Sequence, residues 1–91
     1  MTKRLDATAG GIAEAARAMR QGQLVAFPTE TVYGLGALAS NAAAIAQLYV
    51  AKGRPQSNPL IVHLAELGQI DDFAVVDARA ERLAASFWPG P

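Results

Sequence analysis

The sequence predicts a small α/β fold in which short buried strands alternate with helices and which leaves an open sheet edge. Apolar residues recur at helical spacing in three stretches, and the apolar runs at residues 24–27 and 60–64 have the length of buried strands. Proline or glycine stands close to the ends of these segments, as expected at element boundaries. At 91 residues, the chain has room for one small domain with a modest core.

The first predicted helix begins after Thr8, whose hydroxyl can accept a hydrogen bond from the first turn. Gly22 stands where a helix stop is expected. The apolar residues between them share one helical face: Ile12, Ala15, Ala16 and Met19.

Residues 24–27 predict a buried strand that ends at Pro28 and leads into the loop sequence PTETVYG. A second short strand is predicted at residues 35–39. Ser40 or Asn41 can then cap a helix that ends near the sequence KGR. The apolar face of that helix carries Ile45, Leu48 and Tyr49.

Pro55 and Pro59 bracket a turn-rich segment. After it, residues 60–64 predict another buried strand, with His63 near its end. Residues 66–73 are weakly helical in pattern.

Asp77 can cap a last helix, whose apolar side is formed by Ala80, Leu83, Ala84 and Phe87. The chain then reads FWPGP, a cluster of breakers that normally leads to another element. Two or three strands alone would leave an open sheet edge and an uncovered face. We therefore expect residues 1–91 to be part of a single α/β domain that is truncated here.

Composition argues against several classes of function. Eight Lys and Arg balance eight Asp and Glu, so no net field draws nucleic acid or an anionic membrane toward the chain. The absence of cysteine removes disulfides and thiolate chemistry, and the single His63 cannot build a histidine-rich metal site. Without a signal-peptide pattern or an apolar run of membrane-spanning length, we expect a soluble cytoplasmic protein with no membrane partner.

The sequence KGRPQSN presents two cations, Lys52 and Arg54, at a predicted helix end. An arginine fork and a lysine point charge suit a polyphosphate better than a single carboxylate. The structural alternative is that both cations only complement the helix dipole. Asn58 also has two interpretations. Its side-chain amide could form hydrogen bonds to the edge of a nucleotide base, or it could close an Asx-turn.

His63 and the PTETVYG loop also have two interpretations. Ligands of open α/β sheets bind outside the carboxyl ends of strands, where both the loop and His63 are predicted. A lone histidine can equally be a satisfied core residue, and Thr29 or Thr31 can simply cap a turn. Since the chain has no phosphate-binding glycine motif and no carboxylate pair at catalytic spacing, the residues alone predict an α/β binding module.

The chain resembles the Sua5/YrdC/YciO family in the motifs PTETVYGLGALA and KGRPQSNPLIVHL, and again in the final FWPGP. Proteins of this family are threonylcarbamoyl-AMP synthases. They join L-threonine, bicarbonate and ATP into threonylcarbamoyl-AMP and release pyrophosphate, on the route to the t6A modification of tRNA. The resemblance implies an ATP-binding nucleotidyltransferase that acts upstream of other t6A pathway proteins. It implies the YrdC-like fold, a twisted open α/β sheet, with residues 1–91 as the N-terminal portion of a single domain.

Residue by residue, the resemblance implies an L-threonine site with Thr31 and His63. It implies an ATP site with Lys52, Arg54 and Asn58. Lys52 and Arg54, together with Mg²⁺, would screen the charge on the reacting phosphates and so act as the catalytic pair.

Family members are longer and carry a further Ser-x-Asn element in their second half, which the Ser57-Asn58 pair does not replace. A non-catalytic nucleotide- or RNA-binding module, with tRNA or double-stranded RNA as partner, is therefore an alternative. Others are an inactive fragment that pairs through its sheet edge and a carbamoyl adenylate-forming domain of the hydrogenase-maturation type. The resemblance assigns no role to Glu30 or Tyr33.

Overall fold

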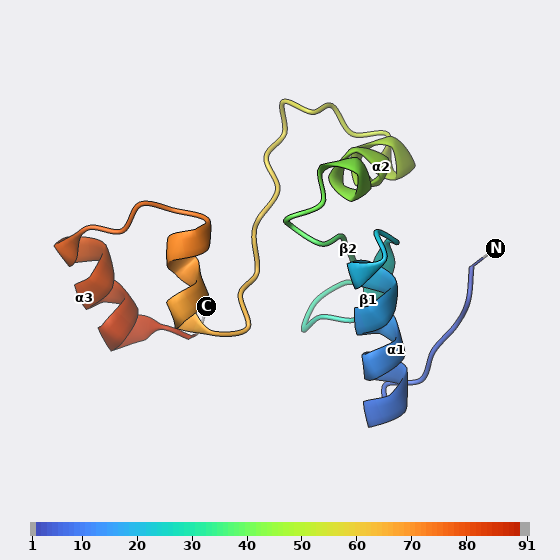
Figure 1. The fold of residues 1–91 in the computed structure, drawn as a ribbon, viewed down its shortest axis with the longest axis horizontal. Helices are drawn as coiled ribbons and strands as arrows, with labels where there is room; N and C mark the ends of the chain where they lie inside the picture. The colour runs from blue at the N-terminus through green and yellow to red at the C-terminus, as the bar shows by residue number, and fades with distance from the viewer. Residues whose placement is uncertain (1, 90–91) are drawn as a thin grey trace. The chain divides into compact units, whose positions relative to one another are not determined.

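The computed structural model describes residues 2–89 and divides into two compact units, with the boundary between Leu60 and Ile61. Each unit is described by itself. The elements of the first unit are α1 (Ala9–Arg20), β1 (Val25–Phe27), β2 (Gly34–Gly36) and α2 (Ala42–Lys52) (Figure 1). Those of the second are the 3₁₀ helix η1 (Leu67–Asp72) and α3 (Ala78–Phe87). The part of the chain that the structure describes is thus a small mixed α/β arrangement.

Helix α1 begins and ends where the sequence predicts. The Thr8 hydroxyl accepts a hydrogen bond from the Gly11 amide at 3.1 Å, which satisfies one of the free N–H groups of the first turn. Beyond the last turn, Gly22 has a φ of 85°, a left-handed conformation that glycine adopts without strain. Both predicted boundary residues are confirmed.

Strands β1 and β2 form an antiparallel hairpin, in which Val25 lies opposite Gly36 and Phe27 opposite Gly34. Each strand has three residues, so the second strand is shorter than predicted and starts one residue earlier. The hairpin contacts α1, which runs beside it in Figure 1. Among the described residues these two strands make up the sheet, so the predicted open sheet is present only as this hairpin.

Helix α2 contains the best-buried side chains of the described chain. Asn41 caps it by accepting a hydrogen bond from the Ala44 amide at 3.0 Å, so one of the two predicted caps is confirmed. Ala44 is 1% exposed and Leu48 3% exposed, and no other apolar residue between 2 and 89 is fully buried. The core is as modest as the chain length predicts.

Residues 60–64 do not form the predicted buried strand. They have no regular secondary structure, and the side chains of Ile61 and Val62 are exposed, as is His63. A strand needs a neighbour that takes its backbone hydrogen bonds. β1 and β2 pair with each other, and no third strand exists in the described residues to pair with this segment.

The second unit is built from two capped helices. The Gln69 side chain accepts a hydrogen bond from the Glu66 amide at 3.0 Å and closes a capping box at the start of η1. The Asp77 carboxylate accepts from the Ala80 amide at 2.9 Å and caps α3. The weak helical pattern at residues 66–73 and the predicted Asp77 cap are both confirmed.

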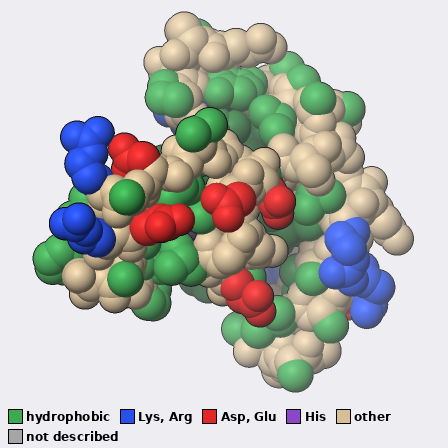
Figure 2. All heavy atoms as spheres, turned by 60° about the vertical axis from the view of Figure 1, so that its left-hand side comes forward, with side chains coloured by type: hydrophobic (Ala, Val, Ile, Leu, Met, Phe, Trp, Pro, Cys, Tyr) green, Lys and Arg blue, Asp and Glu red, His purple; other side chains and the backbone are tan. Residues whose placement is uncertain are grey.

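Many large apolar side chains stay at the surface. Leu83 and Phe87 of α3 are 61% and 73% exposed, and Figure 2 shows apolar side chains reaching the surface beside charged ones. Full burial of such a side chain contributes about 1.5–3 kcal/mol, and each exposed one forgoes part of this. Within the described range, none of the helices has the length and apolar character needed to cross a membrane.

Asp77 gives α3 a pH dependence. The Ala80 amide, followed by Arg79, holds the pKa of the Asp77 carboxyl below its usual value. Stability from a carboxyl with a depressed folded-state pKa is present above the unfolded pKa of about 3.9 and is lost as the pH falls through the folded-state pKa. We expect the α3 amides to lose protection from hydrogen exchange below about pH 4. Asp77→Asn keeps the capping oxygen without titrating, so an equal loss in that variant would contradict the prediction.

Candidate functional site

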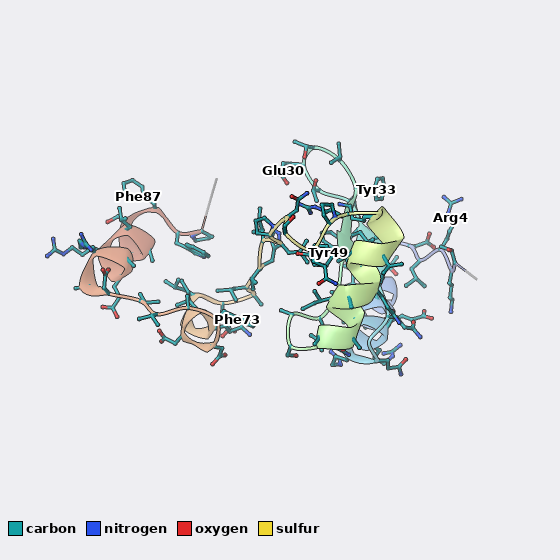
Figure 3. The ribbon with its side chains drawn as sticks, turned by 90° about the horizontal axis from the view of Figure 1, so that it is seen from above. Arg4, Glu30, Tyr33, Tyr49, Phe73 and Phe87 are labelled. Atoms are coloured by element: carbon teal, nitrogen blue, oxygen red, sulfur yellow. The ribbon has the colours of Figure 1, made fainter. Side chains whose placement is uncertain are left out.

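The hairpin loop between β1 and β2 carries the predicted threonine-binding residue Thr31. The Thr29 hydroxyl accepts a hydrogen bond from the Thr31 amide at 3.2 Å and donates to the Val32 carbonyl. The two threonine hydroxyls lie 3.4 Å apart, and Thr31 is exposed. Thr29 therefore makes the local turn and leaves Thr31 accessible to a ligand. Glu30 and Tyr33, labelled in Figure 3, belong to the same exposed loop.

The two glycines after this loop make room for an aromatic ring. A Cβ on Gly36 would stand 2.7 Å from the Phe27 ring, and one on Gly34 would stand 3.3 Å from it. Such contacts are closer than carbon atoms can approach without displacement. In this structure the two glycines therefore serve the packing of Phe27.

Gly36→Ala is expected to displace the Phe27 ring and to destabilise the hairpin by about 1 kcal/mol, as overpacking does. Amide hydrogen exchange across β1 and β2 measures this change. Gly68→Ala is the matched control, because a Cβ there meets no atom within 4 Å. Unchanged exchange in the Gly36 variant would show that the ring moves away at no cost.

The end of α2 holds the predicted cations in a fixed turn. Gly53 has a φ of 59°, its amide donates to the Val50 carbonyl, and the Arg54 amide donates to the Tyr49 carbonyl at 2.9 Å. This pair of bonds is a Schellman motif, which requires a left-handed residue and so favours glycine. Lys52 ends the helix, and Arg54 follows one residue after the glycine.

The segment after Arg54 folds back as a hydrogen-bonded turn. The Asn58 amide donates to the Pro55 carbonyl at 3.0 Å, and Arg54 Nη2 donates to the Pro59 carbonyl at 3.3 Å. The Tyr49 hydroxyl donates to the Asn58 carbonyl at 2.6 Å. The predicted ATP-site residues Lys52, Arg54 and Asn58 thus belong to one helix end and the turn that follows it.

The charge of this helix end is available to an anion. Lys52 and Asn58 are exposed, and Arg54 is half-buried. The ion pairs of the described residues join Lys3 to Glu14 and Arg79 to Asp77, so neither neutralises Lys52 or Arg54. Two cations at one turn without a carboxylate partner can bind a phosphate chain.

The structure does not place His63 at the end of a strand, as the sequence predicts. His63 lies in the irregular segment at the start of the second unit, whereas Thr31 and the α2 turn belong to the first. A crevice shared by the Thr31 loop and His63 at the carboxyl ends of strands stays a prediction, because the two belong to different units. β1 pairs only with the antiparallel β2, and residues 60–64 do not extend that sheet.

The described residues do not offer a donor set for a divalent metal. No group of three or more Asp, Glu or His side chains comes together within residues 2–89. Mg²⁺ often keeps its waters and is bound through substrate phosphates with only one or two carboxylates. Residues 2–89 therefore show no preformed Mg²⁺ site, and Mg²⁺ that arrives on ATP phosphates would need at most one or two carboxylates from the protein.

Thr29 and Tyr49 both have a structural part in the site, and the sequence indicated only the first of them, as a possible turn cap. Thr29 shapes the loop that carries Thr31, and its position two residues before that amide is a signal of an ST-turn. Tyr49 was assigned to the apolar face of its helix, yet its hydroxyl bonds to the carbonyl of Asn58. Nothing in the local pattern reports a contact across nine residues, so this role could be found only in the structure.

The chain is similar to several known proteins. The model of the Sua5/YciO/YrdC family, described as "Telomere recombination", matches residues 17–91. A threonylcarbamoyl-AMP synthase of Bacillus subtilis is 52% identical over 80 residues, which is 87% of this chain and 23% of that protein. The protein of the same name from Halorhodospira halophila is 46% identical over 82 residues, covering 88% of this chain and 42% of that one.

A solved structure is similar as well. The crystal structure of P. abyssi Sua5 complexed with L-threonine aligns with a TM-score of 0.84 and 49% identity, over 98% of this chain and 26% of that one. The chain thus spans about a quarter of the Bacillus and P. abyssi proteins that it matches. Because the family model covers most of its residues, the chain belongs to the Sua5/YciO/YrdC family.

Proposed function

We propose that this chain is the N-terminal portion of the YrdC-like domain of an L-threonylcarbamoyladenylate synthase. The observation that carries the proposal is its 52% identity to a threonylcarbamoyl-AMP synthase over 87% of the chain. The reaction consumes L-threonine, bicarbonate and ATP, and it yields threonylcarbamoyl-AMP, pyrophosphate and water. Its product serves the t6A modification of tRNA.

The nucleotide side of the site is assigned to the end of α2. Lys52 and Arg54 bind the phosphates of ATP, and Asn58 contacts the nucleotide from the following turn. The support is local: all three belong to one fixed segment, and no ion pair of the described residues neutralises the two cations. Charge-assisted bonds from arginine to phosphate are among the stronger polar contacts, so this segment can anchor a triphosphate.

The amino-acid side is assigned to Thr31 and His63. The similar P. abyssi protein was solved with L-threonine, which supports threonine as the amino acid. Thr31 is exposed in a loop that Thr29 holds, and so can present a hydroxyl to a small polar substrate. His63 is also exposed, and its ring can donate or accept a hydrogen bond.

The chemistry needs positioning and charge screening from the protein. The threonine amine captures bicarbonate, with loss of water, and becomes a carbamate. A carbamate oxygen then attacks the α-phosphorus of ATP, and the bond to pyrophosphate breaks. Two anions must approach, so Lys52 and Arg54 act by lowering their repulsion and by stabilising charge on the leaving group. Alignment of bound reactants can contribute effective molarities of about 10⁵ M or more.

The test compares two proteins. One is the 91-residue chain, and the other is an extended chain in which the remaining part of the Halorhodospira halophila synthase follows it. Each is incubated with ATP, Mg²⁺, L-threonine and labelled bicarbonate, and label is measured in threonylcarbamoyl-AMP. We expect threonine-dependent product from the extended chain.

Each result has a distinct meaning. Product from both proteins would show that the essential groups lie within these 91 residues. Product from the extended chain alone would support the proposal that these 91 residues are a portion of a synthase and need further sequence for activity. Failure of the extended chain to form product, or label that appears in carbamoyl adenylate without threonine, would overturn the proposal.

A further inference from the structure

We propose that Tyr49 is a positioning residue, which holds the turn after α2 in the conformation that presents Arg54 and Asn58 to a nucleotide. The proposal rests on the proposed function for its ligand. Its structural part rests on contacts within the first unit alone.

Tyr49 is attached to this turn at two places. Its backbone carbonyl accepts the Arg54 amide at 2.9 Å, at the beginning of the segment. Its hydroxyl donates to the Asn58 carbonyl at 2.6 Å, near the end of the segment. Tyr49 thus contacts both ends of the segment. It bonds to Arg54, where the turn leaves α2, and to Asn58, near the end of the turn.

The helix that carries Tyr49 contains the best-buried side chains of the described chain. Leu48, the preceding residue, is 3% exposed, and Ala44 is 1% exposed. Tyr49 itself is half-buried, and Figure 3 shows it on α2, whose C-terminal end leads into the turn. A ring that starts from a packed helix has few conformations, so its hydroxyl loses little entropy when it bonds to the turn.

The turn needs such support because it has little of its own. Its residues 55–59 are exposed, and their one internal backbone bond joins the Asn58 amide to the Pro55 carbonyl. Arg54 Nη2 also reaches the Pro59 carbonyl, at 3.3 Å. When a phosphate competes for that guanidinium, the Tyr49 hydroxyl remains as a side-chain bond that holds the end of the turn.

The test is Tyr49→Phe, which removes only the hydroxyl. Tyr33→Phe is the matched control, because it removes the chain's other phenol from the hairpin loop. Amide hydrogen exchange of the four residues in 54–59 that are not proline, and ATP affinity by calorimetry, are measured on the 91-residue and extended chains. A net hydrogen bond contributes about 0.5–1.5 kcal/mol, so we expect the variant to bind ATP about 2- to 10-fold more weakly.

The pattern across the measurements decides the proposal. Faster exchange at residues 54–59, weaker ATP binding and unchanged L-threonine affinity in Tyr49→Phe, with no change in Tyr33→Phe, support it. Unchanged ATP affinity in a parent chain that binds ATP overturns it, as does an equal loss of ATP and threonine affinity, which indicates general destabilisation. If neither parent chain binds ATP, the proposed function is overturned, and that result does not bear on the contact between Tyr49 and the turn. The exchange rates then decide whether Tyr49 holds the turn, and equal rates overturn that role.

Discussion

Arg54→Ala is expected to weaken ATP binding by about 10- to 100-fold, because hydrogen bonds to charged groups contribute about 1.5–3 kcal/mol. The substitution removes a cation that no described ion pair neutralises, and it also removes the bond from Nη2 to the Pro59 carbonyl. Both effects act on the same turn. Calorimetric titration of the extended chain with ATP measures the change, and added salt should reduce the difference from the parent.

Two further variants separate the contributions of Arg54. Arg54→Lys keeps the charge but loses the planar fork, so it should recover only part of the affinity. Arg4→Ala is the matched control, since it removes an exposed arginine that precedes α1. Unchanged nucleotide affinity in Arg54→Ala would leave this arginine as a structural residue that closes the turn to Pro59.

Local signals in the sequence predicted the helices well. Thr8, Asn41 and Asp77 each cap a helix at the expected place, since a side-chain oxygen that accepts from an amide three residues later needs no distant partner. Gly53 ends α2 for an equally local reason, its left-handed φ. Helix boundaries that are set by contacts within one turn can therefore be predicted from a short stretch of sequence.

The failed strand shows where local pattern stops being sufficient. Residues 60–64 are apolar and resemble a buried strand, but a strand exists only when another strand takes its hydrogen bonds. Burial likewise depends on what covers a side chain, and Ile61 is 83% exposed. The sequence reports the tendency of a segment, whereas pairing and burial depend on residues far away along the chain.

The candidate site likewise has one part that the local sequence predicts and one part that depends on distant residues. Lys52, Arg54 and Asn58 could be grouped from the sequence because a helix end and the turn that follows it keep them close. The predicted association of His63 with the loop of Thr31 relied on a sheet that the described residues do not form. That association remains a proposal, supported by family membership.

Thr31→Ala is expected to raise the L-threonine concentration needed for product formation by about 10- to 100-fold, since L-threonine is charged and such hydrogen bonds contribute about 1.5–3 kcal/mol. ATP affinity should stay within about twofold, because the phosphate-binding cations lie on the α2 turn and not on the hairpin loop. Steady-state rates of the extended chain at varied L-threonine, together with calorimetric ATP titrations, separate the two affinities.

The loop geometry supplies the controls for Thr31. Thr31→Ser keeps a hydroxyl and should restore most of the threonine dependence. Thr29→Val removes the bonds from Thr29 to the Thr31 amide and the Val32 carbonyl, so it should weaken threonine binding through the shape of the loop. If Thr31→Ala lowers both affinities equally while Thr31→Ser does the same, the hydroxyl has no specific role. The loop would then act on both substrates through the stability of the hairpin.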